Sequence, residues 1–123
     1  MTLTQKDKEA FIALIAGYAL DYAPLYDIAV VSPIVAQAIL ESGWGRSKLA
    51  KEYYNYFGMK TGSRWNGPSI NLTTKEEYTP GIPISIRDYF RVYNSTAEGV
   101  KCYFEFLQLD ATTKMTNLFL ARG

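Results

Sequence analysis

The most informative part of the sequence for the fold is AQAILESGWGRSKLA, residues 36–50. It continues a helical pattern that opens at Ser32-Pro33, a serine suited to the N-cap followed by a proline suited to the first helical position. Gly43 and Gly45 are typical of residues that end a helix. The sequence therefore predicts a helix that carries Glu41 at its carboxyl end. The apolar residues of this helix are Val35, Ala36, Ile39 and Leu40.

Hydrophobic spacing predicts further helices on both sides of this stretch. Upstream, Thr4 can cap a helix that Pro24 stops or closely follows. A short helix is expected over about residues 47–54, and Ser95 caps another, followed by a weaker helical segment over residues 110–123. The expected buried positions are Phe11, Leu14, Ile15, Tyr18, Ala19 and Tyr22 in the first helix, and Ala97, Val100, Tyr103, Phe104 and Leu107 in the last.

Between these helices the pattern changes to that of a β-hairpin. Residues 69–78 are rich in β-branched side chains, Pro80-Gly81 reads as the turn, and residues 82–86 begin the second arm. Pro83 favours an edge strand, because proline cannot donate a ladder hydrogen bond. Helices, a small hairpin and more helices predict an α+β fold in which helix dominates.

Composition limits the chemistry. The 123 residues fit one domain, and the formal net charge of +1 gives no basic stripe for duplex DNA. Histidine is absent and Cys102 is the only cysteine, which excludes histidine-based triads and the usual zinc sites. Carboxylates, tyrosines, lysines and hydroxyls remain for catalysis. The first residues do not form a secretory signal, and no apolar run is long enough to span a membrane.

Glu41 is the first candidate for chemistry. Apolar neighbours and the negative end of the helix dipole both favour a neutral, protonated carboxyl group there. Such a group is what a general acid needs to protonate a leaving oxygen. A solvated glutamate at a helix end is the alternative, and it is common.

The hairpin offers a second acid, since Glu76 and Glu77 lie in its first arm. Strand side chains alternate between faces, so only one of the two can face a groove. Two facing carboxylates are the glycosidase arrangement, whereas a solvated charge pair beside Lys75 is the alternative. Aromatic residues and asparagines near these acids in sequence either line a sugar-binding cleft or serve the core and turns. They are Trp44, Tyr54, Asn55, Tyr56, Phe57, Trp65, Asn66 and Tyr78.

The stretch 36–50 resembles the signature of the bacterial glucosaminidase domain, glycoside hydrolase family 73. Four further blocks follow in the family's order, at residues 54–60, 65–67, 74–78 and 90–95, so the resemblance covers about residues 8–108. It implies a lysozyme-like fold, with helices framing a substrate groove and the hairpin forming one lip. It also implies cleavage of the β-1,4 bond that follows N-acetylglucosamine in peptidoglycan.

The same resemblance implies roles for individual residues. The signature glutamate, Glu41, is the family's catalytic acid, and the glutamate just before tyrosine in the hairpin, Glu77, is its distal acid. Substrate contacts are expected from Trp44, Asn55, Tyr56, Phe57, Trp65 and Tyr78. Tyr54 stands where the family commonly has an asparagine. Family members usually continue past a segment like 121–123 into a tyrosine-containing stretch and a final helix, so residues 1–123 are expected to be a catalytic domain lacking that helix.

The sequence thus predicts an endo-acting N-acetylglucosaminidase for peptidoglycan glycan strands. We expect a monomer that needs no metal or organic cofactor, binds no nucleic acid and acts outside the cytoplasm, in the cell wall or periplasm. One rival is a muramidase or lytic transglycosylase on the same fold. The other is a cell-wall-binding module without turnover.

Overall fold

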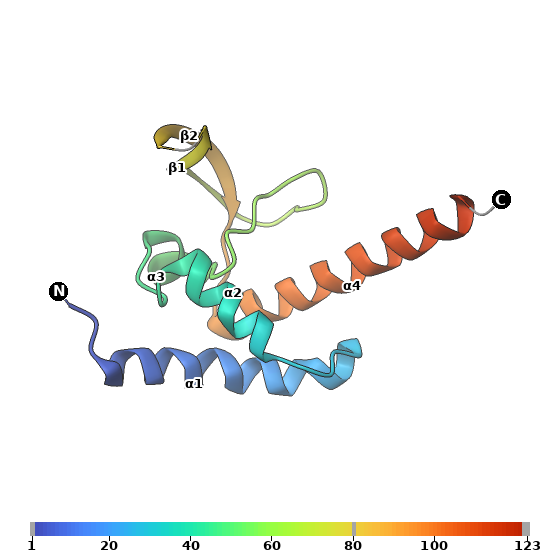
Figure 1. The fold of residues 1–123 in the computed structure, drawn as a ribbon, viewed down its shortest axis with the longest axis horizontal. Coiled ribbons are helices and arrows are strands. Elements are labelled where there is room, and N and C mark those ends of the chain that lie inside the picture. The colour runs from blue at the N-terminus through green and yellow to red at the C-terminus, as the bar shows by residue number, and fades with distance from the viewer. Residues whose placement is uncertain (1, 80, 122–123) are drawn as a thin grey trace.

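The computed structural model describes residues 2–79 and 81–121, with the backbone alone for residues 74–79, 83, 84, 86 and 119 (Figure 1). Helices dominate, and one two-stranded antiparallel sheet projects from them as a hairpin. The elements are α1 (Gln5–Tyr22), the 3-10 helix η1 (Ala23–Tyr26), α2 (Ser32–Ser42), α3 (Lys48–Tyr53), β1 (Ser69–Thr79), β2 (Ile82–Arg91) and α4 (Thr96–Ala121). The expected helix-dominant α+β fold is confirmed.

Helix α1 begins where the sequence predicted. Thr4 accepts a hydrogen bond from the backbone N–H of Asp7, and the Asp7 carboxylate accepts one from the N–H of Thr4. This reciprocal pair satisfies two N–H groups that have no partner within the helix. Along the expected apolar face, Phe11, Ile15 and Ala19 are buried, but Leu14 is 42% exposed. The prediction for Leu14 was wrong because the buried row follows a strict i, i+4 spacing.

Helix α2 differs from its prediction at its start and in its buried face. Ser32 is its first residue and does not cap it; the N-cap is Val31, which makes no side-chain hydrogen bond. The face turned to the core again follows the i, i+4 row, so Ala36 and Leu40 are exposed. The buried residues are Ile34, Val35, Ala38 and Ser42. Glu41 therefore lies beside this row, on the side of α2 that is open to solvent.

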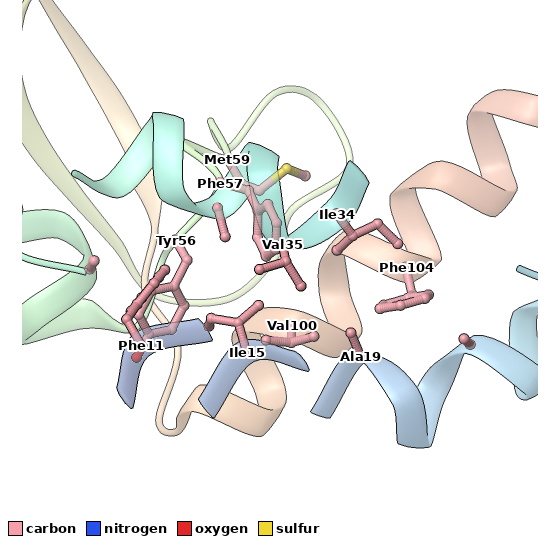
Figure 2. Packing of buried hydrophobic residues seen from close by; sticks show 13 residues of the cluster. Phe11, Ile15, Ala19, Ile34, Val35, Tyr56, Phe57, Met59, Val100 and Phe104 are labelled. Carbon is pink, nitrogen blue, oxygen red and sulfur yellow. The ribbon is translucent and has the colours of Figure 1, made fainter. Parts of the chain in front are cut away.

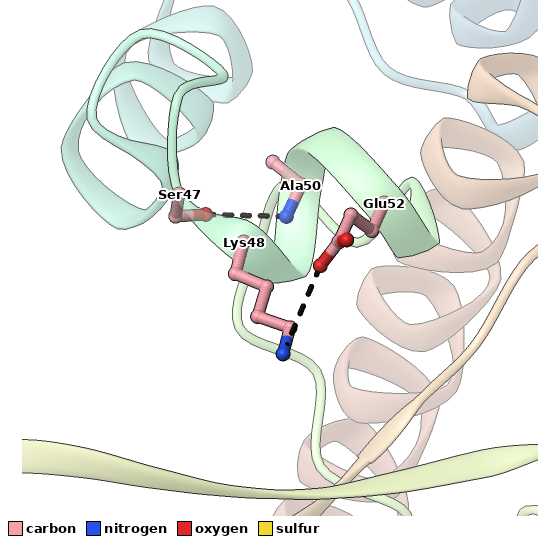
Figure 3. A network of polar contacts seen from close by, with 4 residues as sticks. All are labelled: Ser47, Lys48, Ala50 and Glu52. Carbon is pink, nitrogen blue, oxygen red and sulfur yellow. Dashed lines mark hydrogen bonds and ion pairs between the residues drawn. The ribbon is translucent and has the colours of Figure 1, made fainter.

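The short helix α3 forms where the sequence predicted it, with Ser47 as its N-cap. The Ser47 hydroxyl accepts a hydrogen bond from the N–H of Ala50, and Lys48 pairs with Glu52 one turn later at 3.9 Å (Figure 3). Both charged side chains are more than half exposed, so this ion pair contributes little to stability. The cap is what starts α3 and thereby turns the chain back after α2.

The core forms where α1, α2 and α4 meet beneath the 55–59 loop (Figure 2). Its larger members come from all four segments: Phe11, Ile15, Ile34, Val35, Tyr56, Phe57, Met59, Val100 and Phe104. Helix α4 is continuous from Thr96 to Ala121, and its second half extends away from α1 (Figure 1). Within the described residues, no helix is both long and apolar enough to cross a membrane.

Gly99 sets how closely α4 approaches the end of α3. A β-carbon on Gly99 would overlap the carbonyl oxygen of Tyr54, whereas one on Gly17 of α1 would meet nothing within 4 Å. We expect Gly99→Ala to lower the free energy of unfolding by about 1–3 kcal/mol, because the backbone must shift to make room. Gly17→Ala is the matched control and should raise it by up to about 1 kcal/mol, since alanine favours the helix. Urea denaturation measures both, and equal effects from the two variants would contradict the close contact.

Candidate active site

The end of α2 is held by Ser42, the residue after Glu41. Ser42 is buried, and its hydroxyl donates to the carbonyl of Ala38 at 2.5 Å and accepts from the N–H of Gly45 at 2.8 Å. The N–H of Gly43 bonds back to the Ile39 carbonyl and closes the helix. These bonds fix the last turn of α2, and with it the place from which the Glu41 side chain projects.

Glu41 carries an exposed carboxyl group with one anchored oxygen. Gln37 lies one helical turn earlier, and its Nε2 donates a hydrogen bond to Oε1 of Glu41 at 3.0 Å. The apolar surroundings expected from the sequence are not what the structure shows, because both Glu41 and Leu40 are exposed. The buried row of α2 runs along the other side of the helix, which leaves Gln37 and Glu41 facing outward.

The 55–59 loop brings its backbone against the other oxygen of Glu41. Asn55 is buried and locks this loop: Nδ2 donates to the carbonyls of Met59 and Arg91, each at 2.9 Å, and Oδ1 accepts from the N–H of Met59 at 2.9 Å. Within the locked loop, Gly58 has a φ of +63°. A β-carbon on Gly58 would lie 3.1 Å from Oε2 of Glu41. The loop thus forms a wall of bare backbone beside the carboxyl group.

Tyr103 of α4 is a titratable group within electrostatic reach of Glu41. Burial raises the pKa of the Tyr103 hydroxyl, and the negative charge of Glu41 raises that pKa further. The ring of Tyr103 stacks on Phe57 with centroids 3.9 Å apart and parallel planes. Tyr103 is therefore neutral at physiological pH, and it ties the 55–59 loop to α4.

Several of the aromatic residues expected to bind sugars make packing contacts within the protein. Tyr56 and Phe57 are both 6% exposed, and the Tyr56 hydroxyl is hydrogen bonded to Thr96 at 3.0 Å. Trp65 donates from Nε1 to the carbonyl of Pro68 at 2.8 Å, and its ring is covered by the Arg91 guanidinium at 5.2 Å. Trp44 is partly exposed at the turn after α2, with its ring edge against Phe11.

The hairpin acids belong to β1. Its backbone pairs Glu76 with Ile84 and Glu77 with Pro83 of β2, before an irregularity between Glu77 and Thr79. The two glutamates are consecutive in the regular part of the ladder. The side chains of Glu76, Glu77 and Tyr78 lie outside the described residues, as does Pro80 of the expected turn.

A pocket of about 370 Å³ lies between the 61–64 loop and the middle of α4. Arg64, Arg91, Glu105 and Phe106 are among its lining residues, and Glu41 is not. Among the described residues, no three His, Cys, Asp or Glu side chains gather closely enough to hold a metal ion.

The hydrogen bond from Gln37 gives the Glu41 carboxyl group a defined position on α2. A carboxyl group in a defined position suits proton transfer to a bound molecule.

Residues 16–120 match the glucosaminidase family, described as mannosyl-glycoprotein endo-beta-N-acetylglucosaminidase. The chain belongs to this family. The match agrees with the resemblance carried by residues 36–50. The matched residues include all of α2, the 55–59 loop, the hairpin and most of α4.

Individual members of the glucosaminidase family show how much of the chain is shared. Peptidoglycan hydrolase FlgJ of Escherichia coli K12 is 41% identical over 78 residues, which make up 60% of this chain and 25% of FlgJ. An autolysin of Enterococcus faecalis is 40% identical over 119 residues, 96% of this chain and 14% of the autolysin. The chain therefore spans about a quarter or less of these relatives.

The crystal structure of the catalytic domain of the autolysin Auto from Listeria monocytogenes has a similar fold. It superposes with a TM-score of 0.68 at 32% identity, covering 85% of this chain and 58% of that domain. This likeness agrees with the fold that the sequence resemblance implied.

Sequence reasoning did not find three residues around Glu41: Gln37, Gly58 and Tyr103. Gln37 could have been found, because residues four apart on a helix are neighbours. Gly58 and Tyr103 come from a loop and a helix distant in sequence, and no local pattern links them to Glu41.

Proposed function

We propose that this glucosaminidase-family domain is a peptidoglycan hydrolase that cleaves the β-1,4 bond following N-acetylglucosamine, with Glu41 as general acid. The observation that carries the proposal is the placement of the Glu41 carboxyl group at the end of α2. One oxygen is anchored by Gln37, while the side chain as a whole stays open to solvent and to substrate. The resemblance of residues 36–50 to the family signature supports the same role, because it implies that Glu41 is the catalytic acid.

In the proposed reaction, protonated Glu41 donates its proton to the glycosidic oxygen as the bond from that oxygen to the anomeric carbon breaks. The leaving sugar departs with a hydroxyl group, and water adds to the anomeric carbon and loses a proton. Glu77 either activates this water or steadies a substrate whose own acetamido oxygen attacks first. In the first route Glu77 takes the proton of the attacking water, and solvent then reprotonates Glu41 and deprotonates Glu77. In the second route Glu41 takes that proton itself as water opens the cyclic intermediate. Neither route consumes a cofactor.

The two hairpin acids should differ in importance. We expect Glu77→Gln to reduce turnover strongly and Glu76→Gln to reduce it weakly, because consecutive strand residues face opposite sides and the family pattern selects Glu77. The rate of soluble sugar release from purified peptidoglycan measures both variants. A larger loss for Glu76→Gln would place the distal acid one residue earlier. Small and equal losses would remove the hairpin from the mechanism.

A binding module without turnover is the rival of a different class. Incubating the chain with insoluble peptidoglycan, pelleting it, and measuring both the bound protein and the released sugar separates the two functions. We expect release that increases with time. Protein that pellets with the wall while the supernatant stays free of sugar would support the binding module instead.

The proposed substrate also indicates where the protein works. Peptidoglycan glycan strands lie in the cell wall or periplasm, so we propose an extracytoplasmic site of action. We also propose that the enzyme is a monomer and has no nucleic-acid partner. The net charge of +1 agrees with the last point, since domains that bind nucleic acid are typically strongly basic.

A further inference from the structure

We propose that Gln37 and Gly58 are positioning residues for Glu41, which together make Oε2 the oxygen that delivers the proton. Gln37 holds Oε1, and Gly58 leaves the space beside Oε2 free for the glycosidic oxygen. The inference rests on the proposed function of Glu41 and adds two residues and an assignment of the two carboxyl oxygens.

The Gln37 amide suits a carboxyl group that must gain and lose a proton. Its Nε2 donates to Oε1 of Glu41 at 3.0 Å, across one turn of α2. The amide is uncharged, so it adds no like or opposite charge to the site. When the proton is on Oε2, Oε1 is a carbonyl oxygen and still accepts the same hydrogen bond. Gln37 can therefore hold Glu41 in one orientation in both protonation states.

Gly58 determines what can approach the other oxygen. A β-carbon at this position would lie 3.1 Å from Oε2, so the Glu41 carboxyl group would have to shift by a few tenths of an ångström. Glycine has no side chain to occupy this space beside Oε2. The wall cannot drift away, because Asn55 closes the loop with three hydrogen bonds and Phe57 stacks on Tyr103 at 3.9 Å.

The charges around Glu41 decide how a change at Gln37 would act. Gln37 on α2 is neutral, and Tyr103 on α4 is neutral at the pH of an assay, because burial and the charge of Glu41 raise its pKa. From the hairpin, Glu76 and Glu77 carry carboxylates whose side chains lie outside the described residues. A carboxylate introduced at position 37 would add a like charge within hydrogen-bond distance of Glu41.

Two substitutions at Gln37 test the anchor. Gln37→Ala should lower kcat about tenfold or more with little change in KM, since a misplaced catalytic group costs rate more than binding. In Gln37→Glu, two carboxyl groups about 3 Å apart share one proton, so the alkaline limb of the pH–rate profile should move up by about one pH unit or more. Gln5→Ala is the matched control, because Gln5 makes the same one-turn contact with Glu9 on α1 at 3.4 Å. It should change neither quantity.

Gly58→Ala tests the wall, with Gly62→Ala as its control. Both glycines have a left-handed backbone, with φ of +63° and +57°, but a β-carbon on Gly62 would meet nothing within 4 Å. The two variants therefore suffer similar backbone strain, and only Gly58→Ala crowds Glu41. We expect the loss of kcat in Gly58→Ala to exceed that in Gly62→Ala by about tenfold or more.

A readout that does not depend on turnover separates this inference from the proposed function. Titration of ¹³C-labelled Glu41 by NMR, in the unmodified chain and in Gln37→Glu, follows the protonation of the carboxyl group directly. A midpoint that moves to higher pH in the variant supports the anchor even if the chain releases no sugar. An identical midpoint overturns the role of Gln37, even if Glu41 proves essential. Equal losses of kcat in the two glycine variants overturn the role of Gly58.

Discussion

Replacing Glu41 with glutamine is expected to slow sugar release from peptidoglycan about a hundredfold to ten-thousandfold, because the amide has no acidic proton to donate to the leaving oxygen. The fold should persist. Glu41 lies on the open side of α2, and a glutamine there can still accept the hydrogen bond from Gln37. Sugar release and a thermal melt on the same preparation measure the two effects together.

Glu9→Gln provides the control for this substitution. Glu9 also accepts a hydrogen bond from a glutamine one turn earlier on an exposed helix face, but it belongs to α1. It should keep full activity and a melting temperature close to that of the unmodified chain. If Glu41→Gln were as active as Glu9→Gln, Glu41 would not be the acid.

The second large effect is expected at Asn55, and it concerns stability. Asn55→Ala removes three hydrogen bonds, those to the carbonyls of Met59 and Arg91 and that from the N–H of Met59. The Met59 carbonyl keeps a bond from the N–H of Arg91, but the buried N–H of Met59 loses its bond to Asn55. An unsatisfied buried group costs about 1–3 kcal/mol and each further lost hydrogen bond about 0.5–1.5 kcal/mol, so the free energy of unfolding should fall by about 2 kcal/mol or more. Urea denaturation measures the loss.

The Asn55 substitution also decides between two roles for this residue. The sequence suggested a contact to substrate, whereas the structure has its amide fully engaged with backbone groups. Asn66→Ala, at an exposed position of the next loop, should change stability by no more than about 0.5 kcal/mol. An Asn55→Ala variant with unchanged stability and a raised KM would restore the role in binding.

The helices could be predicted from the sequence because local chemistry determines where they start. The Thr4 cap forms as expected, and Ser95 accepts a hydrogen bond from the N–H of Glu98 at the start of α4. The expected Ser32 cap does not form, since Ser32 is the first residue of α2. Such caps depend on residues three positions apart. The hairpin also follows from local patterning, since β1 and β2 span the two arms that β-branched residues and turn signals marked.

The buried faces were harder to predict. Leu14 and Leu40 are apolar and lie near helical spacing, yet both are exposed. Which apolar row of a helix faces inward depends on neighbours distant in sequence, and for α2 the row through Ile34 and Ala38 is the buried one. The aromatic residues illustrate the same limit, because Tyr56 and Phe57 suit a sugar platform and a core equally well by composition.

The candidate site divides in the same way. Glu41 could be identified because its helix end and the following glycines form one continuous motif. Its partners could not, apart from Gln37, because the wall of the site comes from the loop that Asn55 locks and from α4. Those contacts arise only from tertiary packing.

The most direct test of the central claim is the identity of the sugar left at the cut end. Peptidoglycan digested by this chain is reduced with borohydride, and the fragments are analysed by mass spectrometry. We predict that every new reducing end is N-acetylglucosamine, and that these ends are missing after digestion with the Glu41→Gln variant. New reducing ends of N-acetylmuramic acid, or anhydro ends that resist reduction, would contradict it.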